Sequence, residues 1–375
     1  MGRADLQVPD DAASDREPHG GGARPPREGD RAGDREAAAD RAGVASAFRP
    51  PWWCRNGHVQ TIWGPLFRRD RLRWRRERVA TSDDDFVDLD WTVGEVRPDA
   101  PVLLILHGLE GSSRSHYAVG LAREALARGW RAVVLNFRSC SGELNRRPQF
   151  YHSGHTDDLD DVVRGLVARE PATRLAAVGV SLGGNVLLKW LGEREAKAPA
   201  QLVGAVAISA PFDLVPCARG LDQGLRRRVY TANFLRTMRA KAERKAARDP
   251  SFATLVDLQQ ARHARTFAQY DRAVTAPLNG FADEMDYWVR ASCAPYLSRI
   301  RRPALLVNAL DDPIVPSAAL PDPRTLPPWV RAEFLERGGH AGFLEGGWPW
   351  RPRSWIERRA IEFLAPLVAP GERLC

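Results

Sequence analysis

Short apolar runs recur along this chain and predict the strands of a buried sheet. They occupy residues 102–106, 175–178, 202–208 and 304–310, with a shorter one at 332–335. Continuous apolar runs of this length are typical of strands that are covered on both faces, as parallel strands are. Helix-compatible segments follow at 159–168 and 185–190. The pattern predicts an α/β fold with a mostly parallel central sheet flanked by helices.

The turn after the second of these runs carries the first sign of chemistry. It reads Gly-Val-Ser-Leu-Gly-Gly over residues 179–184, between an apolar run and a helical segment. A serine hydroxyl acts as a nucleophile when a sharp strand-to-helix turn holds it, and glycines there let strand and helix pack without a Cβ between them. We therefore predict that Ser181 is a nucleophile; a plain glycine-rich connection is the alternative.

A catalytic acid is predicted at the end of the run 304–310. In this architecture the triad follows the order serine, acid, histidine, and the run ends in Asp311-Asp312-Pro313. That turn places a carboxylate at the edge of the sheet where catalytic groups gather. We favour Asp312, which directly precedes the proline. Asp311 is then expected to be a turn residue whose side chain caps a backbone amide.

The base is predicted in a glycine-rich loop near the C-terminus. His340 lies within Gly338-Gly339-His340-Ala341-Gly342, and it is the only one of eight histidines that follows the acid turn. We predict that it is the general base. The glycines on either side are expected to let the imidazole swing over the nucleophile.

An oxyanion hole is predicted where the run 102–106 ends. The loop that follows reads His107-Gly108-Leu109-Glu110-Gly111, and its glycines bring backbone amides close to the serine. Two such donors are needed where the tetrahedral oxygen forms, and we assign the amides of Leu109 and Leu182. His107 is expected to hold this loop through its ring hydrogen bonds rather than to act as a second base.

Together these motifs resemble the YheT-type branch of the α/β-hydrolases, which includes bacterial YheT proteins, plant embryogenesis-associated hydrolases, and mammalian esterases and phospholipases. The similarity runs from about Pro50 to about Leu367. The resemblance implies an α/β-hydrolase fold, a serine triad and carboxylic-ester hydrolysis. Gly57 stands where the family commonly has a proline, which is expected to loosen one turn. The matching segments are 55–62, 107–111, 136–145, 151–154, 179–184, 308–313 and 339–340.

A helical cap insertion is predicted over about residues 212–298. Leu225, Val229, Phe234 and Leu235 recur there at helical spacing among many arginines. Such a cap normally closes over the serine and shapes the acyl pocket. Its basic residues suggest weak peripheral contact with anionic lipid head groups. The polar loop 138–143, with residues 151–153 just beyond it, is expected to form a wall of the substrate site.

Composition narrows the other possibilities. The formal charge is +8, but the basic residues fall in separate clusters without a nucleic-acid reading module, so no nucleic-acid partner is expected. The five cysteines are scattered without the close pairs of metal or redox sites. The predicted triad chemistry requires no metal and no cofactor, and none is expected. Cys140 lacks a glycine turn and is not expected to be the nucleophile.

Chain organisation follows from the same composition. Residues 1–47 mix acids and bases with Gly, Pro and Ala and are predicted to be a disordered tail; residues 48–375 are predicted to form the hydrolase domain. The tail lacks the apolar core of a secretory signal, and no apolar run approaches the roughly 18 to 20 residues of a membrane span. A cytoplasmic location and a monomer are therefore expected.

The sequence thus predicts a serine hydrolase that cleaves small-molecule or lipid esters through Ser181, His340 and Asp312 and an acyl-enzyme. A thioesterase or amidase of the same fold stays open. A catalytically silent binding or scaffold protein is the alternative from another class, because fold alone does not establish function.

Overall fold

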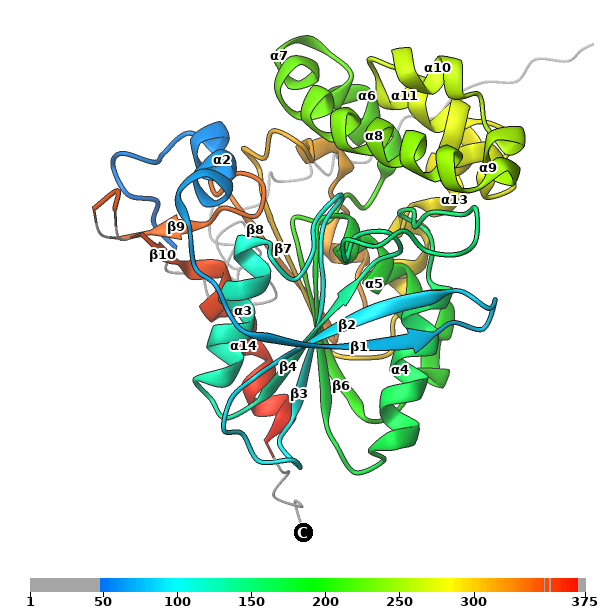
Figure 1. The fold of residues 1–375 in the computed structure, drawn as a ribbon. Coiled ribbons are helices and arrows are strands. Elements are labelled where there is room, and N and C mark those ends of the chain that lie inside the picture. The colour runs from blue at the N-terminus through cyan, green and yellow to red at the C-terminus, as the bar shows by residue number, and fades with distance from the viewer. Residues whose placement is uncertain (1–47, 347, 351, 370–375) are drawn as a thin grey trace, which may run out of the picture. The chain divides into compact units, whose positions relative to one another are not determined.

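The computed structural model describes residues 48–346, 348–350 and 352–369. The predicted disordered tail lies outside the described residues. The centre is an eight-stranded sheet in the order β1-β2-β4-β3-β5-β6-β7-β8 (Figure 1). All neighbours from β4 to β8 are parallel, and β1 and β2 add an antiparallel hairpin at one edge, so the predicted sheet is confirmed. The strands are β1 (Trp74–Ala80), β2 (Phe86–Thr92), β3 (Val102–Leu106), β4 (Arg131–Asn136), β5 (Leu175–Val180), β6 (Leu202–Ile208), β7 (Ala304–Ala309) and β8 (Val330–Leu335).

Helices cover both faces of this sheet. Helices α3 (His116–Leu126) and α14 (Trp355–Val368) lie on one face, and α4 (Asp157–Arg169) and α5 (Leu182–Arg194) on the other (Figure 1). The alternation of side chains along β3 shows why both faces are apolar. Leu103 and Ile105 belong to the core beneath α3 and α14, whereas Leu104 and Leu106 belong to the core beneath α5.

A short N-terminal helix, α2 (Gly57–Phe67), is tied to the segment that follows the predicted catalytic histidine. The buried side chain of Gln60 donates from Nε2 to the carbonyl oxygens of Cys54 (2.8 Å) and Leu344 (3.2 Å), and its Oε1 accepts from the Leu344 amide (2.7 Å). Leu344 begins β9 (Leu344–Glu345), which pairs with β10 (Arg353–Ser354). Helix α2 and this C-terminal segment are therefore held together by a fully hydrogen-bonded buried amide.

Between β6 and β7 the chain forms a group of helices beyond the carboxyl ends of the strands (Figure 1). Leu235 is buried there, but Leu225 and Val229 are exposed, and the π-helical turn η2 interrupts the α-helical spacing that was assumed for these residues. The elements are α6 (Leu214–Leu221), α7 (Gly224–Arg226), η2 (Arg227–Thr231), α8 (Ala232–Arg248), α9 (Pro250–Leu255), α10 (Leu258–His263), α11 (Phe267–Tyr270), η3 (Asp271–Thr275), α12 (Ala276–Leu278), α13 (Glu284–Ala291) and η4 (Ala294–Arg299). Three further 3₁₀ turns are η1 (Glu195–Lys197), η5 (Ser317–Ala319) and η6 (Pro323–Thr325).

Two lysines of the basic helix α8 point inward. Lys245 is buried and donates to the carbonyl oxygens of Asn145 (2.6 Å) and Arg146 (3.2 Å). Lys241 donates to Oε1 of Glu110 at 2.6 Å. These two charges therefore hold the helical insertion on the loops that follow β3 and β4. Within the described residues, no helix combines the length and apolar character that crossing a bilayer requires.

Arg138 is a structural residue rather than a wall of the substrate site. Its buried guanidinium donates to Asp158 (2.6 and 2.9 Å), Asp83 (2.9 and 3.0 Å) and Asp85 (3.3 Å), joining the β1–β2 hairpin to the start of α4. Burial acts to raise the pKa of Asp83, but the Arg138 hydrogen bonds outweigh it, and the pKa lies well below its usual range.

We expect Arg138→Leu to lower the free energy of unfolding by about 3–5 kcal/mol, because it leaves Asp85 and Asp158 buried without their cation. Urea titration measures the loss. The matched control is Arg97→Leu, whose ion pair with Asp99 is exposed and whose removal should leave the free energy of unfolding nearly unchanged. Equal effects of the two substitutions would contradict a structural role for Arg138.

Candidate active site

Ser181 sits on a strained turn between β5 and α5. Its φ of 54° and ψ of −122° are unusual for a residue with a side chain, and such strain is maintained only where the surroundings impose it. The surroundings here are backbone, since a Cβ on Gly183 would lie 2.5 Å from the carbonyl oxygen of Leu106. Only glycine at 183 lets α5 start this close to β3. This agrees with the expectation that the glycines of the motif let strand and helix pack without a Cβ between them.

The three predicted triad residues form one chain of hydrogen bonds. Ser181 Oγ lies 2.8 Å from His340 Nε2, and His340 Nδ1 lies 2.8 Å from Asp312 Oδ2. The other carboxylate oxygen, Oδ1, accepts from the amides of Ile314 (2.7 Å) and Val315 (3.0 Å). Because a carboxylate only accepts, Nδ1 carries the imidazole proton, and Nε2 is left to accept from the serine hydroxyl.

Asp311 faces a different partner. Its Oδ1 accepts from the Gly339 amide at 2.9 Å, so it caps the backbone of the histidine loop. Burial raises the pKa of the Asp311 carboxyl, and the charge of neighbouring Asp312 raises it further. Of the two adjacent acids, the structure places Asp312 against the imidazole.

The histidine loop is held in place, so the expectation that its glycines let the imidazole swing is wrong. The His340 amide donates to Thr61 Oγ1 at 2.9 Å, and the Ala341 amide donates to Ser209 Oγ at 3.0 Å. Gly339 has φ 59°, and a Cβ there would overlap the carbonyl oxygen of Gly57. The glycine is needed for close packing of the loop on α2.

Helix α2 thus contributes a residue that the sequence interpretation missed. Thr61 Oγ1 accepts from the His340 amide and donates to the Gly57 carbonyl at 2.7 Å. The only signal in the sequence was that Thr61 lies in the segment 55–62 that resembles the family. The turn at Gly57 has no room for a side chain, because a Cβ there would overlap the carbonyl oxygen of Asp311.

Neither amide assigned to the oxyanion hole has a protein acceptor among the described residues. In the loop after β3, the Gly108 amide donates to Tyr117 Oη (2.9 Å), the Glu110 amide to Tyr151 Oη (2.7 Å) and the Gly111 amide to the Gly108 carbonyl (2.9 Å). Within the described residues the Leu109 amide has no such acceptor, and neither has that of Leu182. Both residues line the cavity that contains Ser181.

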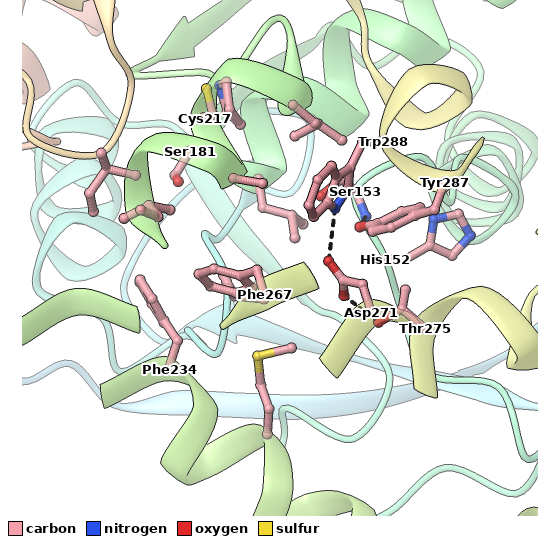
Figure 2. A pocket seen from close by; sticks show the side chains of 18 of the residues that line it. His152, Ser153, Ser181, Cys217, Phe234, Phe267, Asp271, Thr275, Tyr287 and Trp288 are labelled. Atoms are coloured by element: carbon pink, nitrogen blue, oxygen red, sulfur yellow. Dashed lines mark hydrogen bonds between the residues drawn. The ribbon is translucent and has the colours of Figure 1, made fainter. Parts of the chain in front are cut away.

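That cavity is largely apolar and lies between the sheet and the helical insertion. Its volume is about 110 Å³. Ser181 lines this cavity together with Phe234, Phe267 and Trp288, which come from the helical insertion (Figure 2). Tyr151, His152 and Ser153 also line it, as expected for a wall of the site; the loop 138–143 does not contribute to this lining.

The two cysteines nearest the site have raised thiol pKa values. Cys217 lines the cavity and Cys140 lies near the loop after β3, but burial raises the pKa of both thiols, which keeps them in the unreactive protonated form. In the part of the chain that the structure describes, no three His, Cys, Asp or Glu side chains are grouped to hold a metal ion.

Comparison with known proteins agrees with this geometry. The alpha/beta hydrolase fold family matches residues 101–347. YheT of Escherichia coli (strain K12), whose name proposes an esterase, is 38% identical over 87% of this chain and 95% of its own length. The phospholipase ABHD3 of Homo sapiens is 29% identical over 88% of this chain and 81% of its own. The Pyrococcus furiosus esterase Pf2001 shares the fold, with a TM-score of 0.50 at 15% identity, covering 79% of this chain and 93% of that one.

These matches define the class of protein: the chain belongs to the α/β-hydrolase family. Within that family it belongs to the branch that contains YheT, so the resemblance drawn from the motifs is confirmed. The relatives in this branch carry esterase and phospholipase names.

His107 shows how the oxyanion loop is held. Its ring is buried; Nδ1 donates to the Gly108 carbonyl at 2.7 Å, and Nε2 accepts from the Phe137 amide at 3.1 Å. Burial lowers the pKa of His107 to about 4. Since the unfolded pKa is about 6.5, the stability that the neutral ring contributes is present above pH 6.5 and lost as the pH falls to about 4.

We expect His107 to stay neutral, with the proton on Nδ1, from pH 8 down to pH 5. Long-range ¹H–¹⁵N correlation spectra distinguish the protonated from the unprotonated ring nitrogen. A titration of this ring with a midpoint near 6.5, the ordinary value for histidine, would contradict the structural role.

Proposed function

We propose that this protein is a serine hydrolase that cleaves carboxylic esters, with Ser181 as nucleophile, His340 as general base and Asp312 as the triad acid. The observation that carries the proposal is the continuous hydrogen-bonded chain from the Ser181 hydroxyl through the imidazole to the carboxylate. The amides of Leu109 and Leu182 supply the oxyanion donors. The esterase and phospholipase names of relatives favour the same class of reaction.

In the first half of the reaction His340 Nε2 takes the proton of Ser181 Oγ as this oxygen attacks the ester carbonyl carbon. The carbonyl oxygen becomes an oxyanion and accepts from the amides of Leu109 and Leu182. Asp312 stabilises the imidazolium without taking its proton. When the carbon–oxygen bond to the alcohol breaks, His340 gives its proton to the leaving alcohol, and the acyl group remains on Ser181.

In the second half His340 deprotonates a water molecule that attacks the acyl carbon. The same two amides receive the second oxyanion. The bond to Ser181 Oγ then breaks, the serine regains its proton from His340, and the carboxylic acid leaves. Thioesters and amides follow the same steps with a different leaving group. The apolar cavity beside Ser181 favours an apolar acyl or alcohol group, but it does not determine whether oxygen, sulfur or nitrogen leaves.

A scaffold protein without turnover is the second class of function. Such a protein would have no need of a serine held at strained backbone angles, and that strain costs free energy. The enzyme hypothesis accounts for the strain.

We expect Ser181→Ala to lower kcat by about 10⁴-fold or more, because the nucleophile is lost. A panel of p-nitrophenyl esters from acetyl to palmitoyl measures this and also reports the preferred acyl length. Labelling of the wild type by a fluorophosphonate should disappear in Ser181→Ala and persist in Cys217→Ser, a control in the same cavity. A folded wild type that is not labelled favours the scaffold instead.

The two adjacent acids should behave differently. Asp312→Asn is expected to lower kcat by about 10⁴-fold, because an amide in this place supports the wrong imidazole tautomer. Asp311→Asn keeps an oxygen that can accept from Gly339 and should cost less than about tenfold. Steady-state kinetics on one ester decides between them. Equal losses of kcat, or a larger loss for Asp311→Asn, would show that the assignment of Asp312 as the triad acid is wrong.

A further inference from the structure

One carboxylate in the cavity has no part in the triad. Asp271 comes from the helical insertion, where it begins the π-helical turn η3 (Asp271–Thr275), and it lines the same cavity as Ser181. Only 5% of the residue is exposed. Single π-helical turns occur often at functional sites. A buried acid among mostly apolar walls therefore calls for a physical reason.

The hydrogen bonds of Asp271 leave acceptor capacity unused. Oδ1 accepts from Thr275 Oγ1 at 2.7 Å, and Oδ2 accepts from Trp288 Nε1 at 2.8 Å (Figure 2). A carboxylate offers about four acceptor positions in total. Both donors are neutral, so they satisfy the carboxylate without compensating its charge.

Asp271 differs in this respect from the other buried acids. Among the described residues, every other buried Asp or Glu forms an ion pair with an arginine or, for Asp312, with His340, whereas Asp271 forms none. Those pairs are Asp85 and Asp158 with Arg138, Asp88 with Arg78, Asp90 with Arg76, Asp160 with Arg194, Glu284 with Arg272, Glu333 with Arg359, and Glu357 with Arg68.

The charges around Asp271 make the binding of a cation beside its carboxylate more favourable. Among the largest influences on its pKa, the charged groups are Asp222 at the end of α6 and Glu284 on α13, and both are acids. Burial is the main reason why the pKa of Asp271 is raised to about 7, and these acids add to the effect. The tyrosines beside it, Tyr270 and Tyr287, have raised pKa values because of burial and stay neutral.

The walls near Asp271 suit a particular kind of cation. Phe267, Tyr287 and Trp288 line the cavity with it, and aromatic faces attract cations with a strength that grows when water is excluded. An alkylammonium group presents methyl or methylene groups to such walls and a positive charge to the carboxylate. A strongly hydrated metal ion would find too few oxygen ligands here.

We propose that this cavity binds the alkylammonium group of an ester substrate, with Asp271 as its counter-ion and Ser181 as the nucleophile that attacks the same molecule. The inference rests on the proposed function. It makes the protein selective for cationic esters over neutral esters of equal shape.

The test compares two esters that differ only in charge: butyrylcholine and its uncharged carbon isostere, 3,3-dimethylbutyl butyrate. At pH 8 we expect the wild type to have a kcat/KM at least about tenfold higher for the cationic ester, from the carboxylate and aromatic contacts together. In Asp271→Asn the ratio should fall to about one, because the loss falls mainly on kcat/KM for the cationic ester.

A matched control distinguishes direct contact between the Asp271 carboxylate and the substrate cation from a long-range effect of negative charge. Asp222→Asn removes the same charge, but Asp222 accepts from the amides of Phe267 and Ala268 and is not among the cavity-lining residues. This variant should keep most of the preference. A ratio near one in the wild type, an unchanged ratio in Asp271→Asn, or an equal loss in Asp222→Asn would each overturn the proposal.

Two further measurements keep the outcome decisive. In the wild type the ratio should rise between pH 6 and pH 8 as Asp271 loses its proton, and taking a ratio removes any pH effect that is common to both esters. This measurement decides if Asp271→Asn does not fold. Calorimetry of choline with Ser181→Ala tests binding without turnover. If choline binds and Asp271→Asn abolishes this binding, but neither ester is hydrolysed, the cation site is supported and the proposed esterase activity is contradicted.

Discussion

Contact of backbone with backbone at the carboxyl edge of the sheet is the constraint on which the rest of this molecule depends. Helix α5 begins against the carbonyl of Leu106, and the histidine loop packs on the carbonyl of Gly57. Neither contact leaves room for a Cβ, so Gly183 and Gly339 are steric necessities. Because such contacts are short and stiff, they fix Ser181 and His340 relative to each other far better than contacts between flexible side chains could.

Local chemistry made much of this site predictable from sequence. The strained turn at Ser181 and the acid turn at Asp312 are each encoded in a few consecutive residues, and the order of the segments identified His340. Strands β3, β5 and β6 were predictable for the same reason, since each is a continuous apolar run, whereas the buried strand β2 carries Asp88 and Asp90 and was not predicted. These features depend on neighbours along the chain, and that is the information a single sequence supplies most directly.

The features that were missed or misinterpreted depend on partners far away in sequence. Thr61 and His340 are separated by 279 residues, and nothing near Thr61 indicates that its hydroxyl will hold the loop. Lys241 and Lys245 belong to the basic residues of the insertion, for which contact with lipid head groups was expected, yet their partners lie 131 and 100 residues away and draw both ammonium groups inward. The unpaired state of Asp271 likewise emerges only when all the buried arginine pairs are known.

The side chain of Glu110 joins the helical insertion to the loop after β3 that carries the Leu109 amide. This residue has φ 57°, its carboxylate accepts from both Lys241 of α8 and Tyr151 Oη, and its amide donates back to Tyr151. Moving α8 away would leave the Glu110 carboxylate, in its half-buried loop, without its cation, a costly state in a medium of low dielectric constant. The position of the insertion is therefore coupled energetically to the neighbouring Leu109 amide. In this fold the element that shapes the cavity also supports the donors that face it.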